Sequence, residues 1–275
     1  MSWGRRAGDR RDLRPQEHGD AWLSFDDYFV AQQGNLGQIR RLRHFVHLVE
    51  PVSSLYELSL DTLRPDKANP LYGKLFLVCH KALMSAAALI ARAQPDDSAG
   101  VTRRAIEAAC LARAIKHDKA NLNRWLSYEK RLARWEAREQ RRKPQPLSPK
   151  IVDPPGHQTV DWLRGQLGVL SDAAVHFTPE FFDQQDWQME DKGGGTVGLS
   201  LQYFEPSQRT IERALLALAS VSLHILELFN ECFDNAFHGD ATWRDLRAEI
   251  QRTGHALAKA TGLPEDDGGD DGPTR

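Results

Sequence analysis

The stretch VTRRAIEAACLARAIKHD, residues 101–118, decides the fold, because nearly every position from 105 to 115 is apolar. Glu107 interrupts this run, and Arg103 and Arg104 precede it by four and three residues, so either arginine can meet Glu107 on one helix face. A buried carboxylate left alone would cost several kcal/mol. We therefore predict a structural ion pair of Arg103, Arg104 and Glu107 that joins this helix to a neighbour.

Two other interpretations of Glu107 stay open. As a functional carboxylate, Glu107 would line a cleft and take part in chemistry. As a surface residue, it would simply be exposed. The structural ion pair is favoured, because the run around Glu107 is otherwise apolar.

Outward from this stretch, apolar residues recur at three- and four-residue intervals through most of the chain, which predicts a bundle of helices. Capping residues and prolines indicate where these helices begin and end. We expect a short aromatic helix opening at Ser24, a helix capped by Asn35 and closed by Pro51, a long apolar helix from Pro70 to about Ala93, a helix capped by Asp97 or Ser98, a surface helix at about 119–142, a helix at about 158–177, a long helix opened by Ser207, and a last helix at about 242–260.

The segment WQMEDKGGGTVGLSLQYF, residues 187–204, lacks this helical period. Two short runs on either side of a glycine-rich turn are typical of a β-hairpin. The GGGT at 193–196 lacks the Gly-Lys-Ser/Thr of a phosphate-binding loop, so it is interpreted as a turn. The sequence therefore predicts an all-α fold, a multi-helix bundle with one small β-hairpin excursion near residues 186–204.

Composition also predicts the domain organisation. Residues 1–18 are rich in Arg and Asp and are expected to form a disordered segment, and residues 263–275 are expected to form an acidic disordered tail. Residues 19–262 are expected to form a single helical domain that includes a Pro-rich linker, 143–156. One domain is favoured because the helices on both sides of this linker carry wide apolar faces that need partners.

A net charge of −2 argues against an overall electrostatic bias towards nucleic acid or membrane. Cys79, Cys110 and Cys232 lie in apolar helical runs and are interpreted as buried thiols, which fits a reducing compartment. The first twenty residues lack the apolar segment of a signal peptide, and the longest uncharged run, 214–226, is too short to span a bilayer. We expect a cytoplasmic protein with no membrane partner.

Positive charge is concentrated in one region. Residues 113–150 hold twelve Lys and Arg against four Asp and Glu, so the local balance is 12 − 4 = +8. Tryptophans and a tyrosine lie among these cations, a pattern that favours contact with a nucleic-acid backbone or an acidic partner. The alternative is a solvated helix that its own glutamates neutralise. The predicted basic face consists of Arg124, Arg131, Arg134, Arg138 and Arg141.

Three elements of the chain resemble a known group. An Ala-rich helix with Arg-x-x-x-Glu, a tryptophan-bearing helix (NRWLSYEKR) and a helix that ends in SDAAVH resemble a loose group of bacterial all-helical proteins, some of them similar in outline to the HEPN superfamily. The resemblance spans roughly residues 70–236. The resemblance implies recurring polar positions at Arg103 or Arg104, Glu107, Ser171 and His176. If it extends to the HEPN superfamily, it also implies an enzyme that acts on RNA, with Glu107 and His176 in a shared cleft.

The HEPN signature is Arg followed by His after four to six residues. Three matches occur, at Arg11–His18, Arg40–His47 and Arg41–His47, which is what chance would give in a chain so rich in arginine. His44 and His47 are three residues apart on one predicted helix, but no carboxylate completes a metal-binding set. We therefore expect no metal and no cofactor, with one of these histidines packed and the other solvated.

These observations predict a binding module that engages a protein or nucleic-acid partner through its basic helix, and a homo-oligomer is compatible with them. The alternative is a HEPN-like enzyme acting on RNA. The binding module is favoured because no set of catalytic residues exceeds chance.

Overall fold

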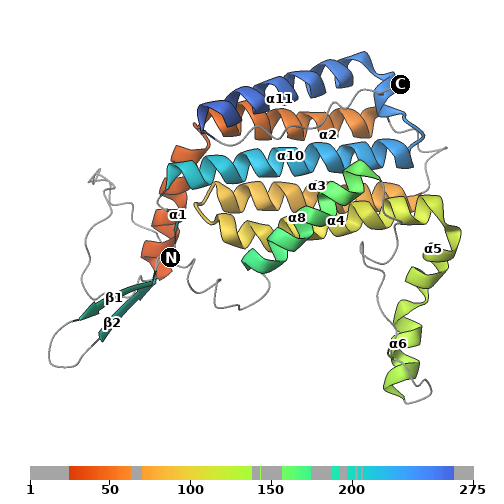
Figure 1. Cartoon of the computed structure of the whole chain (residues 1–275), viewed down its shortest axis with the longest axis horizontal. Coiled ribbons are helices and arrows are strands. Elements are labelled where there is room, and N and C mark those ends of the chain that lie inside the picture. Colours follow the sequence, from red (N-terminus) through yellow and green to blue (C-terminus); the bar gives the residue numbers. More distant parts are fainter. Residues whose placement is uncertain are drawn as a thin grey trace, which may run out of the picture.

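The computed structural model describes residues 25–62, 70–137, 143, 157–174, 187–191, 197–201, 204–205 and 207–262. Within these ranges the packed structure is a bundle of α-helices, so the predicted all-α class is confirmed. Three long helices form its centre and other helices cover them (Figure 1). The central helices are α3 (Pro70–Ile90), α4 (Pro95–His117) and α10 (Gln208–Cys232), and α2 (Glu50–Thr62), α8 (Gln158–Ala174) and α11 (Ala241–Ala260) pack around them.

The Ala-rich stretch forms the buried half of α4, as its composition predicts. Small side chains let α3 approach α4 closely enough for a bond between side chain and backbone, since the Cys79 thiol donates to the Ala105 carbonyl at 3.1 Å. All three cysteines are free and buried, which confirms their interpretation as core thiols. Burial raises the pKa of the Cys232 thiol to about 12, so this thiol stays protonated at neutral pH.

Aromatic rings fill the other half of the core, where α3, α10 and the start of α11 meet. Phe76 on α3 lies edge-on to Phe229 on α10, with ring centroids 5.1 Å apart. Phe237 lies in a short 3-10 helix, η2 (Phe237–Gly239), and packs against Trp243 of α11. Because Phe76, Phe229, Phe237 and Trp243 are completely buried, this cluster holds α11 on the bundle.

The first helices differ from expectation. Asn35 does not cap a helix but lies inside α1 (Phe25–Ile39), where its amide donates to the Arg92 carbonyl instead. Pro51 does not end a helix either, because a π-helical turn, η1 (Phe45–Val49), leads directly into α2. In this turn Glu50 N–H donates to the Phe45 carbonyl, one residue further back than in an α-helix. This longer turn lets the chain continue into a proline, which has no N–H to donate.

Caps fix the ends of the later helices. The prediction of Asp97 or Ser98 as the cap of α4 is wrong, because α4 starts earlier, with Pro95 in the first helical position. Ser207 opens α10 as predicted, its hydroxyl accepting a hydrogen bond from Thr210 N–H. After α11 ends, Gly262 takes the left-handed conformation and lies beside Arg209, in the first turn of α10.

Helix α3 is also long and apolar enough to cross a membrane, judged by length and composition alone. The buried core helix of a soluble protein passes the same test. Here α3 packs against both α4 and α10, and 44% of its most apolar window is buried inside the bundle. Among the described residues it is the one helix with this property.

Two short strands lie between α8 and α10 in the chain, and the predicted hairpin excursion that would contain them stays a prediction. The backbones of β1 (Trp187–Asp191) and β2 (Val197–Leu201) pair antiparallel, with Trp187 opposite Leu201 and Asp191 opposite Val197. Their side chains lie outside the described residues. The predicted disordered ends, 1–18 and 263–275, and the predicted linker 143–156 apart from Lys143 also lie outside them, so these boundaries stay predictions.

Candidate functional site

The predicted basic helix leaves the bundle at the end of α4. Asp118 takes an extended conformation there and caps the next helix, its carboxylate accepting from Ala120 N–H at 2.8 Å. The chain then forms α5 (Lys119–Leu126) and α6 (Tyr128–Glu136), which extend away from the other helices (Figure 1). We call α5 and α6 together the basic arm. The prediction of one helix across 119–142 is wrong, because Ser127 separates the two.

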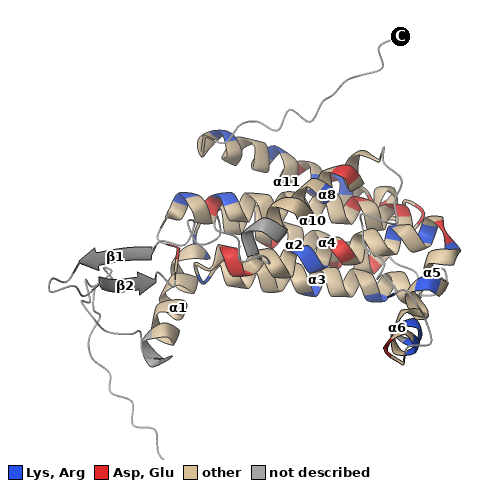
Figure 2. Cartoon of the chain, turned by 60° about the horizontal axis from the view of Figure 1, so that its bottom comes forward, with Lys and Arg blue, Asp and Glu red and all other residues tan. Residues whose placement is uncertain are grey.

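Cations line this arm, as Figure 2 shows in blue. Arg124, Lys130 and Arg134 are exposed. Arg131 is partly buried, and one of its terminal nitrogens donates to the Arg124 carbonyl at 3.0 Å. Lys119, at the start of α5, is exposed as well. The arm's cations therefore differ, because these four side chains offer solvated charge whereas Arg131 binds the arm's own backbone. Arg138 and Arg141, also predicted for this face, lie outside the described residues.

A cluster of ionisable side chains lies where the arm joins the bundle. The Glu231 carboxylate on α10 is its centre, with Arg113 Nε at 3.0 Å, His157 Nε2 at 2.8 Å and His117 Nε2 at 3.9 Å. We call these four residues the Glu231 junction. His157 Nδ1 accepts from Val160 N–H at the start of α8, so the His157 proton is on Nε2 and faces Glu231. The junction thus joins α4, α8 and α10 through one carboxylate.

Neighbouring charges extend the junction. Lys116 on α4 donates a hydrogen bond at 2.6 Å to Asp234, which lies just beyond the end of α10. This hydrogen bond raises the pKa of Lys116. The Arg113 side chain is only 10% exposed, so its pairing with Glu231 is the most desolvated of these contacts. A charge pair shielded from water in this way is held more strongly than one on the surface.

Glu107 forms an ion pair with Arg103, as predicted, and the described pair lies within one helix. Its carboxylate lies 2.9 Å from Arg103 Nε, but both residues belong to α4, and the Glu107 side chain is 42% exposed. Arg104, the third member of the predicted ion pair, is an exposed residue. A pair of this kind stabilises its own helix by about 0.3–0.5 kcal/mol. Among the described contacts, the Glu231 carboxylate links different helices, and a link from the Arg103–Glu107 pair to a neighbouring helix stays a prediction.

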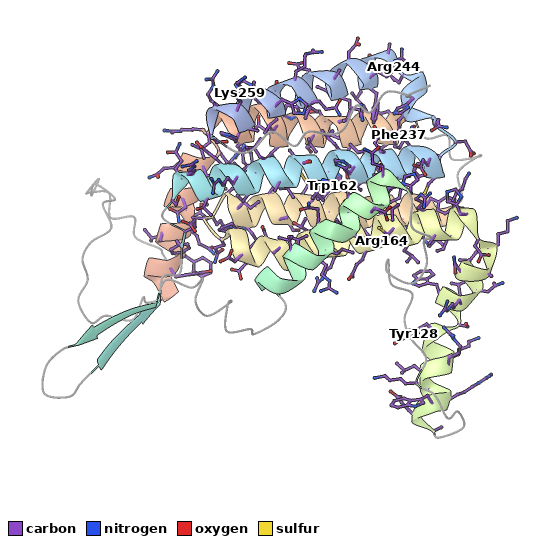
Figure 3. The ribbon with its side chains drawn as sticks, in the orientation of Figure 1. Tyr128, Trp162, Arg164, Phe237, Arg244 and Lys259 are labelled. Atoms are coloured by element: carbon purple, nitrogen blue, oxygen red, sulfur yellow. The ribbon has the colours of Figure 1, made fainter. Side chains whose placement is uncertain are left out.

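Glu231 belongs to a polar stripe on α10 that was not among the predicted site residues. His224, Glu227 and Glu231 recur at three- and four-residue spacing, which places them along one helix face. His224 stacks on Trp162 of α8 with ring centroids 3.9 Å apart, and Glu227 lies against His238 at 3.2 Å (Figure 3 labels Trp162). The spacing of these three residues could have indicated a polar face on α10. The apolar residues around them instead indicated a helix buried entirely in the core.

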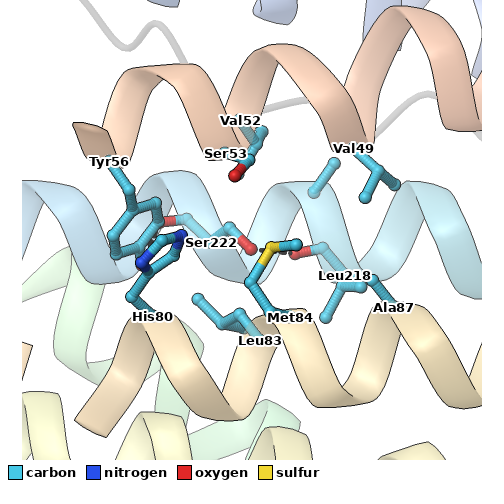
Figure 4. Close-up of a pocket in the computed structure, with 11 residues that line it drawn as sticks. Val49, Val52, Ser53, Tyr56, His80, Leu83, Met84, Ala87, Leu218 and Ser222 are labelled. Carbon is cyan, nitrogen blue, oxygen red and sulfur yellow. Dashed lines mark hydrogen bonds between the residues drawn. The ribbon is translucent and has the colours of Figure 1, made fainter. Parts of the chain in front are cut away.

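The cavity in Figure 4 lies between α2, α3 and α10 and offers little room. Its volume is about 20 Å³, enough for one water molecule and far below that of a substrate pocket. His80 stacks on Tyr56 at its edge, and the buried His80 Nε2 has no hydrogen-bond partner. Burial lowers the pKa of His80. The basic arm and the Glu231 junction are therefore better candidates for function than this cavity.

His44 and His47 behave as expected. His44 is buried and His47 is exposed, which confirms that one is packed and the other solvated. His44 Nδ1 lies 3.8 Å from Glu212 of α10. No group of three or more His, Cys, Asp or Glu with metal-binding geometry occurs among the described residues.

The remaining predicted site residues cannot be placed beside Glu107. His176 lies outside the described residues, and so does the side chain of Ser171 in α8. The shared cleft of Glu107 and His176 therefore stays a prediction. Comparisons of the chain with family models, with curated proteins and with solved structures give no match.

Proposed function

We propose that the protein is a non-enzymatic binding module that engages the phosphate backbone of a nucleic acid through its basic arm. One observation carries the proposal: Arg124, Lys130 and Arg134 are exposed on a pair of helices that extends away from the bundle. Phosphates attract such cations and release counterions when they bind. A projecting arm also gives a long polymer access from several sides.

Aromatic and apolar side chains on the same arm support this choice. Leu126 is 62% exposed, and Trp125, Tyr128 and Trp135 are each partly exposed. Lys143 lies over the Trp135 ring, 5.2 Å from its centroid, so that ring already accepts a cation. The bases of single-stranded nucleic acids stack on aromatic side chains that lie between cations on a protein surface.

The test is reversal of the arm's charge. In Arg124→Glu/Lys130→Glu/Arg134→Glu, binding of a fluorescent single-stranded oligonucleotide should be lost. If weaker binding remains, the slope of the logarithm of the binding constant against the logarithm of the salt concentration should decrease by about three, one for each lost phosphate contact. Fluorescence anisotropy at several salt concentrations measures both quantities.

The matched control reverses three exposed arginines of the bundle, in Arg209→Glu/Arg213→Glu/Arg252→Glu. It changes the net charge by the same amount, so binding should persist if the arm is the site. Equal losses in the two triple variants would refute the proposal, and so would the absence of any binding by the unaltered protein.

A second candidate is an RNA-cleaving enzyme, distantly HEPN-like, and the Glu231 junction favours it. His117 and His157 both lie against Glu231 at the root of the basic arm, where a bound strand would pass. Histidines are the commonest general acids and bases. This candidate requires loss of end-labelled RNA that His117→Ala and His157→Ala each abolish. Intact RNA after incubation with the unaltered protein would exclude it.

We also propose a cytoplasmic location, because three buried free thiols fit a reducing compartment. In the predicted hairpin excursion near residues 186–204, the described side chain is that of Phe204, which stacks on Tyr28 of α1 and is not part of the basic arm. Self-association likewise stays a prediction, which light scattering with and without the oligonucleotide tests.

A further inference from the structure

The basic arm is broken at a place where its sequence does not require a break. Residues 119–136 contain neither proline nor glycine, the usual causes of a sharp kink. Nevertheless α5 ends at Leu126 and α6 begins at Tyr128, with Ser127 between them. The cause of the break must therefore lie in the contacts around Ser127.

Those contacts converge on one backbone oxygen. The Arg124 carbonyl accepts from the Ser127 hydroxyl at 3.3 Å and from a terminal nitrogen of Arg131 at 3.0 Å. In an uninterrupted α-helix this carbonyl would accept from the N–H of residue 128. Serine side chains are known to compete with the backbone in this way. The guanidinium of Arg131 thus occupies an acceptor that a continuous helix needs.

Arg131 is not fully satisfied in this arrangement. Its Nε is buried and has no hydrogen-bond partner. An unmet buried donor disfavours the broken form, and a phosphate can accept from Nε and a terminal nitrogen of one arginine together. The same side chain therefore has a better partner available in a phosphodiester than in the Arg124 carbonyl.

We propose that the joint at Ser127 is a phosphodiester-binding switch: when Arg131 binds a backbone phosphate, it releases the Arg124 carbonyl, and α5 and α6 join into one helix. The inference rests on the proposed binding of nucleic acid and states how that binding is regulated. Joining has a further effect, because Arg124 and Arg131 are seven residues apart. In one continuous helix they share a face at a separation of about 10.5 Å.

The test measures the distance across the joint. Exposed Asn123 and Ala133, each replaced by cysteine, carry spin labels. The three native cysteines are buried and will not compete for the label. Addition of a single-stranded oligodeoxythymidine should lengthen the label-to-label distance and increase the helical circular dichroism signal. A matched duplex and poly-glutamate are tested in parallel, the latter representing an acidic protein partner.

Variants of the arm distinguish a change at the joint from a general electrostatic attraction between the arm and the oligonucleotide. Arg131→Gln should bind at least fivefold more weakly and show no lengthening on binding. Arg134→Gln, its neighbour on α6, should bind more weakly but still lengthen. Ser127→Ala removes one of the two groups on the Arg124 carbonyl, so the free protein should already show some of the longer distance.

The outcomes distinguish this inference from the proposed function. Binding without a change of distance would overturn the joint but leave nucleic-acid binding intact. No binding of either oligonucleotide would overturn both. Lengthening that only poly-glutamate produces would assign the joint to an acidic protein partner and would overturn the phosphodiester assignment.

Discussion

At the scale of single residues, the bundle depends on a few buried polar contacts between helices distant in sequence. Trp243 of α11 is completely buried, and its indole N–H donates to the Ser59 hydroxyl of α2 at 2.8 Å. Ser59 in turn donates to the Leu55 carbonyl, one turn earlier. Because both groups are removed from water, neither can replace its partner with solvent.

Ser59→Ala should destabilise the fold by about 1–3 kcal/mol, because the Trp243 N–H is left buried without an acceptor. Ser54 is the matched control, since it lies on the same helix with its hydroxyl on a backbone carbonyl but is exposed. Urea denaturation of Ser54→Ala should stay within about 0.5 kcal/mol of the parent. Similar losses in both variants would contradict a specific role for the contact with Trp243.

His44 predicts how stability depends on pH. Burial lowers the pKa of His44 below its usual 6.5, assisted by Arg43 and opposed by Glu212. The unfolded chain therefore takes up a proton at about pH 6.5 that the folded chain does not, and stability falls as pH falls through this range. The contribution of neutral His44 to stability is fully present above about pH 6.5. His80, whose pKa burial also lowers, acts in the same direction.

The measurement is the Tm at pH 7.5 and at pH 5.5. His44→Gln should show a smaller decrease in Tm between these two values than the parent. His47→Gln, which alters an exposed histidine three residues away, should keep the full decrease. A decrease that is unchanged in His44→Gln would show that other groups cause it.

At the scale of elements, the sequence predicted helices better than it predicted their joints. The apolar period located α3, α8, α10 and α11 because burial on one face requires that spacing. It could not show that a π-helical turn carries the chain through Pro51, or that Arg131 reaches back to the Arg124 carbonyl. Both depend on three-dimensional contacts that have no period.

The candidate site shows the same limit. Ion pairs within one helix, such as Arg103–Glu107, follow from spacing. Glu231 and Arg113 are 118 residues apart, and His157 joins them from a third helix, so no local pattern could have brought them together. The sequence therefore predicted the ion pair within α4 but could not predict the contacts of Glu231.

Glu231→Gln should cost about 2–3 kcal/mol in urea denaturation, because Arg113 and His157 both lose their charged partner. Glu107→Gln should cost about 0.5 kcal/mol or less, since its pair is half exposed and lies within α4. The comparison is direct, because both variants replace a glutamate by its amide. A larger loss in Glu107→Gln would return the link between helices to that residue.

At the scale of the whole molecule, the bundle and the basic arm are separable. Helix α5 is tied to the bundle, because buried Asn121 donates to the Ala114 carbonyl and Leu122 packs on the core. Helix α6 continues from the end of α5, away from the bundle (Figure 1). The arm leaves the bundle at His117, and the chain re-enters the bundle at His157. Both histidines lie against Glu231. The two ends of the excursion are therefore close together.

Replacement of residues 127–156 by about fifteen Gly and Ser residues, which span roughly 21 Å, should leave the bundle folded. The Tm should stay within about 3 °C of the parent, because the removed helix contributes little to the core. Oligonucleotide binding should be lost in the same protein. A folded variant that still binds would move the binding site from α6 to α5 or to the bundle.

The left-handed Gly262 fixes where the following acidic residues can act. It lies beside Arg209 at the first turn of α10, whereas the arm departs beside Glu231, near the last turn. Asp271 is nine residues further along the chain, and its backbone reaches at most about 31 Å, while the 22 residues from Arg209 to Glu231 rise about 33 Å along α10. Contact between the acids at 265–271 and the arm of their own molecule would therefore require an almost fully extended chain. Screening of that arm by the acids of a second copy needs no such extension, and its extent will rise with protein concentration.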